Sequence, residues 1–243
     1  MRLNRVFVEQ SLARGALIDL PAEAAHYIGT VLRLRDGDQL HIFDGSGGCY
    51  LARIAACRRR SVSVEALEFL SEERESPFSI TLAQGIARGQ HMDYIVQKAV
   101  ELGVQRIAPL LTEYSNVRLD EARTAHRMQH WRRVIIGACE QCGRNRLPQL
   151  LPPVPFSDWI AADTNPLRLA LNPEGKCRLG ELSAGGAGIT LLCGPEGGLA
   201  DNEYEVALRA GYTGVRLGPR ILRTETAAIA ALAACQLLWG DLR

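Results

Sequence analysis

The chain has 243 residues, of which 47% are hydrophobic and 23% charged. This is the composition of a globular protein, and it excludes the disordered, collagenous and coiled-coil classes. The length fits one large domain or two modest ones. The 28 basic and 27 acidic residues leave a formal charge of +1, which, taken over the whole chain, argues against a strongly basic nucleic-acid-binding protein.

The first part of the chain is predicted to be mostly β-structure. Glycine- and aspartate-rich turns separate the short alternating runs, as is typical of a small barrel, and one helix-like stretch at 22–34 interrupts them. The strands are expected at 5–8, 39–43, 50–55 and 61–67.

A change in charge marks a domain boundary. Residues 1–64 carry nine arginines against six acids, whereas residues 65–75 hold five glutamates and one arginine. Pro77 follows, and a new apolar run begins at Ile80. We therefore predict a first domain at 1–72 and a second at 73–243.

The second part alternates between strands and helices, which predicts an α/β domain with a largely parallel sheet covered by helices. The expected strands are 80–84, 107–111, 168–171, 189–193 and 215–217, and the expected helices are 93–102, 124–142, 201–210 and 225–239.

The clearest local signal is the sequence GPEGG at 194–198, which follows the apolar strand 189–193. Ligands of open α/β sheets lie beyond the carboxyl ends of the strands, where glycines let the backbone approach closely. Asp201 is the expected N-cap of the next helix. The loop matches neither a Walker A motif nor a GxGxxG fingerprint, so nucleotide triphosphates and a Rossmann-type oxidoreductase lose their usual support.

Two further loops have the same position after a strand. One covers 217–224, with Thr224 as the expected N-cap of the last helix and Glu225 in its first turn. Its Arg220 and Arg223 flank an apolar pair and favour an anionic or polar ligand. The other covers 171–175. Three such loops predict one shared pocket.

No metal site is expected. Cys139 and Cys142 form a CxxC pair, but it closes a helical run and has no further ligands at a zinc spacing. His126 and His130 are interpreted as a solvated helix face. The seven scattered cysteines, the absence of a signal peptide and an apolar run of only about 12 residues at 227–238, against the ~20 that span a bilayer, predict a soluble, cytoplasmic protein without a membrane segment.

Two basic clusters leave two interpretations open. The stretch 118–146 holds seven arginines against three acids, and Arg58, Arg59 and Arg60 form a second cluster. Both are able to bind RNA phosphates, and both also fit solvated charge runs. Of the 28 basic residues 26 are arginines, which a GC-rich genome would also produce.

Four motifs in order connect the chain to a known family: QKAVELG at 97–103, ACEQCGR at 138–144, GPEGG at 194–198 and LGPRILRTETA at 217–227. Over essentially its whole length the chain resembles the bacterial 16S rRNA uracil-N3 methyltransferases, the RsmE family of the SPOUT superfamily. The resemblance implies an N-terminal PUA-like RNA-binding barrel and a SPOUT α/β domain whose C-terminal segment forms a trefoil knot.

The resemblance also implies an activity. The expected enzyme is a homodimer that uses S-adenosylmethionine to methylate N3 of one uridine in the decoding region of 16S rRNA, either as free RNA or within the small ribosomal subunit. The apolar last helix is a candidate for the dimer interface and fits core packing equally well.

Candidate site residues follow from the resemblance, residue by residue. The cofactor is expected in the three loops, at Leu171, Asn172, Gly194, Pro195, Glu196, Gly197, Gly198, Leu217, Gly218, Ile221, Leu222 and Thr224. RNA contacts are expected from the charge pattern instead, at Arg58, Arg59, Arg60, Arg144 and Arg146 in the two basic clusters and at Arg220 in the loop 217–224.

Uracil N3 carries a proton and sits on the pairing edge, so the base must be unpaired and deprotonated before it reacts. Arg223 is the candidate for stabilising the charge that develops on the uracil oxygens. Glu196 and Glu225 are candidates for accepting the proton or ordering the loop, and the sequence does not choose between them. The competing hypothesis is a non-catalytic RNA-binding or ribosome-assembly protein, which cofactor binding would distinguish.

Overall fold

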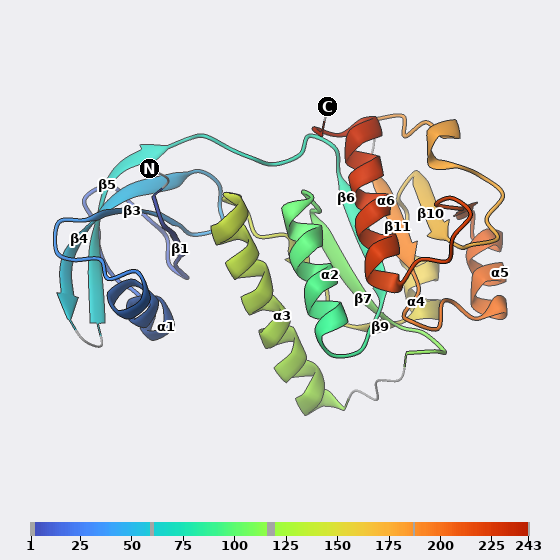
Figure 1. Cartoon of the computed structure of the whole chain (residues 1–243), viewed down its shortest axis with the longest axis horizontal. Coiled ribbons are helices and arrows are strands. Elements are labelled where there is room, and N and C mark those ends of the chain that lie inside the picture. Colours follow the sequence, from blue (N-terminus) through green and yellow to red (C-terminus); the bar gives the residue numbers. More distant parts are fainter. Residues whose placement is uncertain (1–2, 59–60, 116–119, 187, 243) are drawn as a thin grey trace. The chain divides into compact units, whose positions relative to one another are not determined.

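The computed structural model describes residues 3–58, 61–115, 120–186 and 188–242. The chain divides into two compact units (Figure 1). The N-terminal unit combines Met1–Glu75 with Cys139–Leu147, and the C-terminal unit combines Ser76–Ala138 with Pro148–Arg243. The C-terminal unit therefore consists of two chain segments, because the short segment 139–147 between them belongs to the N-terminal unit.

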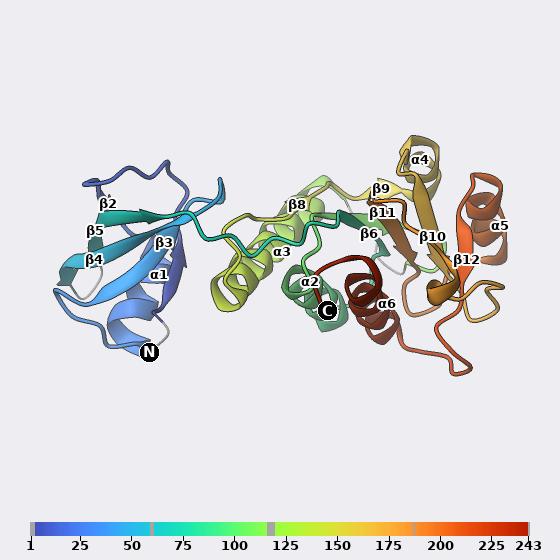
Figure 2. The ribbon, with the colours of Figure 1, turned by 90° about the horizontal axis from the view of Figure 1, so that it is seen from above.

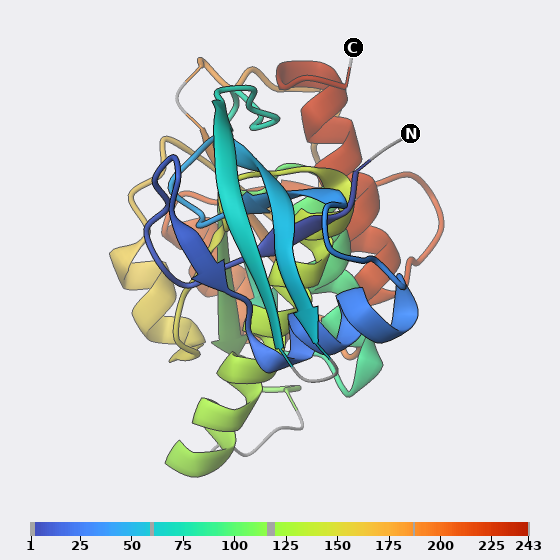
Figure 3. The ribbon, with the colours of Figure 1, turned by 90° about the vertical axis from the view of Figure 1, so that its left-hand side faces the viewer.

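The N-terminal unit contains one five-stranded sheet, in the order β1-β3-β4-β5-β2 (Figure 3). Strands β1 and β3 pair in parallel and the others antiparallel. The alternating apolar residues of the strands form its core, which includes Ile18, Leu40 and Val64. The strands are β1 (Arg5–Phe7), β2 (Leu17–Asp19), β3 (Gln39–Phe43), β4 (Cys49–Arg58) and β5 (Ser61–Leu70).

The expected helix at 22–34 is shorter than predicted. It consists of α1 (Ala22–His26) and a π-helical turn η1 (Tyr27–Val31). Strands β4 and β5 run longer than their hydrophobic patterns, because hairpin pairing between Arg58 and Ser61 extends the ladder beyond the core. Strand β2 was not predicted, since three residues are too few to show an alternation.

The C-terminal unit contains a parallel sheet, as predicted. Within the described residues its order is β12-β10-β11-β6-β7-β8, and β9 also pairs with β7. Every pairing is parallel. The strands are β6 (Ile80–Gly85), β7 (Arg106–Leu111), β8 (Gln149–Leu150), β9 (Val154–Pro155), β10 (Leu167–Leu171), β11 (Ile189–Cys193) and β12 (Thr213–Val215).

Helices cover both faces of this sheet (Figure 2). Helices α4 and α5 pack on one face through a core that includes Trp159, Ile160 and Ala207. Helices α2 and α6 pack against each other, and α6 contacts β11 on the other face. The helices are α2 (Gln90–Glu101), α3 (Glu121–Cys142), α4 (Phe156–Ala162), α5 (Asp201–Arg209) and α6 (Thr224–Trp239), with a short 3₁₀ turn η2 (Leu179–Glu181).

Two differences from the predicted elements have local causes. Helix α4 was not predicted, because its seven residues span too few turns for a clear period. Strand β12 ends at Val215, where its pairing with Leu171 stops, so 216–217 belong to the following loop. In the part of the chain that the structure describes, no helix has the length and apolar character needed to span a bilayer.

A buried polar network lies under the α4–α5 face. The Tyr212 hydroxyl donates to Asp163 Oδ2 and accepts from Trp159 Nε1 at 3.1 Å. Burial, reinforced by the bond to Asp163, raises the pKa of Tyr212 well above its usual range. The hydroxyl is therefore held protonated as a donor.

We expect Tyr212→Phe to lower the free energy of unfolding by about 2 kcal/mol, because Asp163 loses a donor and the Trp159 N–H loses its acceptor. Urea denaturation of the variant and the parent measures the change. Tyr27→Phe is the matched control. Because Tyr27 is 51% exposed, removal of its hydroxyl should lower the free energy of unfolding by less than about 0.5 kcal/mol. Equal effects of the two substitutions would contradict a role for the network.

Candidate cofactor pocket and catalytic groups

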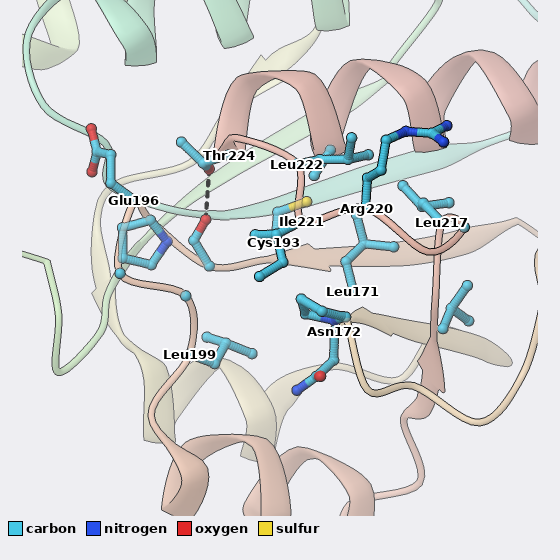
Figure 4. Close-up of a pocket in the computed structure, with 18 residues that line it drawn as sticks. Leu171, Asn172, Cys193, Glu196, Leu199, Leu217, Arg220, Ile221, Leu222 and Thr224 are labelled. Carbon is cyan, nitrogen blue, oxygen red and sulfur yellow. Dashed lines mark hydrogen bonds between the residues drawn. The ribbon is translucent and has the colours of Figure 1, made fainter.

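Three loops meet at one edge of the parallel sheet. Strands β10, β11 and β12 are neighbours and end at Leu171, Cys193 and Val215. Because parallel strands point the same way, the loops that follow them gather at the same edge. They enclose a pocket of about 300 Å³, at the lower end of ligand-binding cavities (Figure 4).

The structure brings together every residue that was predicted to hold the cofactor. Each one lines this pocket, from Leu171 and Asn172 through the 194–198 loop to the residues before α6. Figure 4 shows Leu171, Asn172 and Leu217 on one side and Glu196 and Thr224 on the other. The sequence did not single out the remaining lining residues as cofactor contacts: Pro173, Cys193, Leu199, Val215, Arg220 and Ala227.

The 194–198 loop is a tight backbone cradle. A Cβ at Gly194 would lie 2.5 Å from the carbonyl carbon of Gly198, and one at Gly197 would lie 2.9 Å from Tyr114 Cβ. Gly198 has a φ of +74°, in the left-handed region that glycine adopts without strain. The glycines are therefore required by space and by conformation, and they keep backbone groups exposed to the pocket.

Gln84, which sequence reasoning missed, ties this cradle to the start of α6. Its Nε2 donates to the Gly194 carbonyl and to Thr224 Oγ1, each at 3.1 Å, and Thr224 Oγ1 donates to the same carbonyl at 2.7 Å. Gln84 is fully buried near the end of β6, in which Thr81 is also a buried polar side chain. A glutamine in a largely apolar strand was the available signal.

The predicted N-cap residues of α5 and α6 are wrong. Asp201 and Thr224 are the first residues of α5 and α6, and neither is an N-cap. The Glu203 carboxylate accepts the backbone N–H of Ala200 at 3.0 Å instead. The Thr224 hydroxyl is used in the contact with the cradle, which stabilises the loop rather than the helix end.

The structure separates the two glutamates proposed as proton acceptors. Glu196 Oε1 accepts the backbone N–H of Arg88 at 2.8 Å, so this carboxylate connects the cradle to the loop that follows β6. Glu225 lies in the first turn of α6, as predicted, with 15% of its side chain exposed. Its Oε1 lies 3.4 Å from Nδ1 of His91, a residue that the sequence did not single out.

The two loop arginines occupy different positions. Arg220 lines the pocket, whereas Arg223 is the N-cap residue of α6 and is not among the lining residues. Both are exposed. Arg223 therefore lies at the positive end of a helix and does not line the pocket.

The RNA-binding prediction is wrong for Arg144, which the structure buries. Its side chain is 4% exposed, and its Nε donates to Glu75 Oε1 at 3.0 Å. A guanidinium enclosed in this way has no free face for a phosphate. Arg146 is 55% exposed and lies 3.4 Å from Glu73, and Arg58 is exposed at the end of β4. Arg59 and Arg60, which the sequence grouped with Arg58 in one basic cluster, fall outside the described residues.

The CxxC pair contributes to packing. Cys139 is fully buried, and burial raises the pKa of its thiol to about 12, so the reactive thiolate hardly forms at neutral pH. Cys142 Sγ donates to the Cys139 carbonyl. No group of three or more metal-ligating side chains occurs among the described residues.

Comparison with known proteins places this architecture in a class. An RNA methyltransferase domain family matches residues 74–236, and an RNA methyltransferase PUA domain family matches residues 20–67. The two domains are therefore those of an RNA methyltransferase with an N-terminal PUA domain. This confirms the predicted α/β class, its mostly parallel sheet and the separate PUA domain.

Full-length relatives define the family more closely. A ribosomal RNA small subunit methyltransferase E from Buchnera aphidicola is 34% identical over 242 residues, which cover 99% of this chain and 98% of that protein. A protein of the same name from Bacillus subtilis is 29% identical, and the match covers 98% of this chain and 100% of that protein. The chain belongs to the ribosomal RNA small subunit methyltransferase E family.

Solved structures agree with this assignment. A putative methyltransferase from Legionella pneumophila, solved with bound S-adenosylmethionine, is 39% identical and superposes with a TM-score of 0.96 over the whole of both chains. A ribosomal RNA small subunit methyltransferase E from Neisseria gonorrhoeae, also bound to S-adenosylmethionine, is 37% identical with a TM-score of 0.92 over the whole of both chains.

Proposed function

We propose that this protein transfers a methyl group from S-adenosylmethionine to N3 of a specific uridine in the decoding region of 16S rRNA. The observation that carries the proposal is the three-loop pocket at the carboxyl ends of β10, β11 and β12. Its support comes from the two full-length structural neighbours that bind S-adenosylmethionine.

The pocket fits this cofactor in its chemistry. Leu171, Leu217 and Leu222 supply apolar surface for a purine ring, and the glycine cradle brings backbone N–H and C=O groups within reach of polar groups. A side chain at Gly194 would fill that cradle. When bound, S-adenosylmethionine supplies an electrophilic methyl group, so the protein's main task is to position the attacking nitrogen.

The residues beside the pocket prepare the uracil. Because N3 is protonated and lies on the pairing edge, the base must leave its helix and lose that proton. Arg223 is proposed to stabilise the negative charge on the uracil oxygens, and Glu225 or Glu196 to accept the proton or order the loops. Arg220, Arg146 and the cluster Arg58–Arg60 are proposed to contact RNA phosphates.

Three further expectations belong to the proposal. The C-terminal segment forms a trefoil knot, two copies form a dimer, and the enzyme works on rRNA or the small subunit in the cytoplasm. Exposed apolar side chains at Ile221 and Leu237, 85% and 58% exposed, support covering by a second copy.

Mass-spectrometric mapping of rRNA after incubation with isotope-labelled cofactor tests the activity. The expected product is a single uridine methylated at N3. A methyl group on a cytosine or on a ribose would contradict the proposed specificity. Absence of any calorimetric affinity for S-adenosylhomocysteine would contradict the enzyme altogether and favour a non-catalytic RNA-binding role.

We expect Arg223→Ala to lower the rate of methyl transfer at saturating cofactor roughly tenfold, or ~1.4 kcal/mol, because an exposed guanidinium stabilises developing charge less than an enclosed one. Arg209→Ala on α5, an exposed arginine paired with Glu205, is the control and should leave the rate unchanged. A rate for Arg223→Ala within about twofold of the parent, or ~0.4 kcal/mol, would rule out this role.

A further inference from the structure

A second cavity of about 850 Å³ opens beside the cofactor pocket. It is lined by the loop before α2, by the first turns of α2 and α6 and by Val134 of α3, and we call it the α2–α6 groove. In Figure 1 both helices begin at the same end of the C-terminal unit, where β6 and β11 finish. The residues that matter here are Arg88, His91, Asp93, Tyr94, Gln97 and Glu225.

The groove adjoins the cofactor pocket at two points. Thr224 lines the pocket, and the next residue, Glu225, lines the groove. Glu196 lines the pocket, and its carboxylate holds the backbone N–H of Arg88, which lines the groove. A group seated in the groove is therefore next to whatever occupies the pocket.

The lining of the groove suits a flipped-out pyrimidine. Tyr94 exposes 48% of its surface. Lys98 Nζ lies over one face of its ring, 5.6 Å from the centroid, and the opposite face is offered for stacking. Gln97 lies three residues further along the same helix face and offers an amide that pairs with the edge of a base. Because two helix N-termini point their positive ends at this groove, negative charge on the ring is favoured there.

One basic group in the groove has a partner that orients it. Nδ1 of His91 lies 3.4 Å from Oε1 of the mostly buried Glu225, while the imidazole itself is 47% exposed. A carboxylate at Nδ1 fixes the tautomer with the proton on that nitrogen and leaves Nε2 free to accept one. Contacts of this kind are often long in the absence of substrate and shorten when it binds.

The other charged groups around the groove are already engaged. Asp93 accepts a contact from His130 Nε2 on α3 at 2.8 Å, and Glu196 holds the Arg88 backbone. The Arg88 side chain is exposed at the rim. Of the described groups facing the groove, His91 combines an exposed ring nitrogen with a positioned carboxylate.

We propose that the α2–α6 groove receives the target uracil and that His91, oriented by Glu225, removes its N3 proton. The inference rests on the proposed function and makes His91 the proton acceptor in place of Glu196 and Glu225, leaving to Glu225 the role of orienting His91. The N3–H bond breaks and its proton moves to Nε2 of His91. Its electron pair stays on N3 and forms the bond to the incoming methyl carbon, while the carbon–sulfur pair leaves with sulfur. The imidazolium, stabilised by Glu225, then releases the proton to water.

The first test is His91→Gln in the full-length protein, with His126→Gln as the control because His126 is exposed on α3 and lies outside both cavities. General-base catalysis contributes on the order of 10²–10⁴, so the single-turnover rate at pH 7 should fall about 100-fold or more. Affinity for S-adenosylhomocysteine should stay within about twofold of the parent in calorimetry, because His91 does not line the cofactor pocket.

A modified substrate provides an independent readout. RNA with 5-fluorouridine at the target position carries a more acidic N3–H and should recover part of the rate lost by the variant. A variant that needs no such rescue, with a rate within about twofold of the parent, overturns the proposal.

Glu225 is tested as a positioning residue in two ways, the first of which needs no methyl transfer. Imidazole nitrogen NMR of the cofactor-free protein should show neutral His91 protonated at Nδ1, and Glu225→Gln should abolish that preference. In the kinetics, His91→Gln combined with Glu225→Gln should lose no more rate than His91→Gln alone, since Glu225 acts through His91. Additive losses, or an Nε2-protonated parent, contradict the proposed pair.

The outcomes separate this inference from the proposed function. A parent enzyme that methylates uridine N3 while His91→Gln remains fully active overturns the role of His91 and leaves the function standing. A parent that methylates another atom overturns the function and the inference together.

Discussion

Arg144→Ala is expected to destabilise the N-terminal unit by about 3–5 kcal/mol, the cost of leaving one member of a buried ion pair without its partner. Arg144 is almost fully buried, and both Nε and Nη2 donate to Glu75, which is itself mostly buried. The substitution leaves the Glu75 carboxylate in a site that disfavours its charge. Hydrogen exchange of peptides from β1 and β3, together with urea denaturation, measures the loss.

The same segment provides a matched control. Arg146 lies two residues further on, is 55% exposed and lies 3.4 Å from Glu73, so Arg146→Ala should cost less than about 1 kcal/mol. Replacing Arg144 and Glu75 together by Met and Leu should recover most of the stability, because an apolar pair of similar size removes the desolvation cost. An Arg144→Ala variant that is stable but binds RNA more weakly, with a shallower salt dependence, would restore the phosphate-binding interpretation.

The Arg144 result shows what charge counting misses. The sequence places a net positive stretch at 118–146 and an acidic stretch at 65–75. Counting charge in each stretch separately suggests an RNA surface and a domain boundary. In the fold only the end of the basic stretch, within 139–147, belongs to the same unit as the acidic stretch, and there the two pair, through Glu75 with Arg144 and Glu73 with Arg146. Complementary signs at distant positions were the signal, but only the tertiary structure determines which charges meet.

The longer elements of the C-terminal unit could be predicted because each carries a local pattern, whereas the two-residue strands β8 and β9 and the seven-residue helix α4 could not. Strand β11 is continuously apolar, and helices α3 and α6 are long enough to show their period. The strand order could not be predicted. Strand β11 lies between β10 and β6, and β6 is more than 100 residues away in the sequence, so no local window contains that pairing.

The candidate site likewise contains residues that a local sequence pattern predicts and residues that it does not. The pocket loops were found because glycine and polar residues directly after apolar strands are a local signal with a structural meaning. Gln84 and His91 were missed because their partners, Thr224 and Glu225, lie more than 130 residues away along the chain. A buried or oriented polar side chain acquires its role only when the fold brings that partner to it.

The cradle itself yields the sharpest expectation about cofactor binding. Gly194 does not need a left-handed conformation, so alanine there is hindered by space alone. The added Cβ would lie 2.5 Å from the Gly198 carbonyl carbon and 2.6 Å from the Leu199 nitrogen, and both are backbone atoms that no rotamer change can move. The loop must open, at the cost of the contacts that Gln84 and Thr224 make with the Gly194 carbonyl.

We therefore expect Gly194→Ala to weaken S-adenosylhomocysteine binding by about 10- to 100-fold, as overpacking of roughly 1–3 kcal/mol implies. Isothermal titration calorimetry measures the affinity, and circular dichroism checks that the fold persists. Gly137→Ala is the control, because its Cβ meets nothing within 4 Å and alanine favours the helix α3 that contains it. Parent-like affinity in Gly194→Ala would mean that the ligand does not depend on the closed cradle, and that the pocket at the ends of β10, β11 and β12 is not where the cofactor binds.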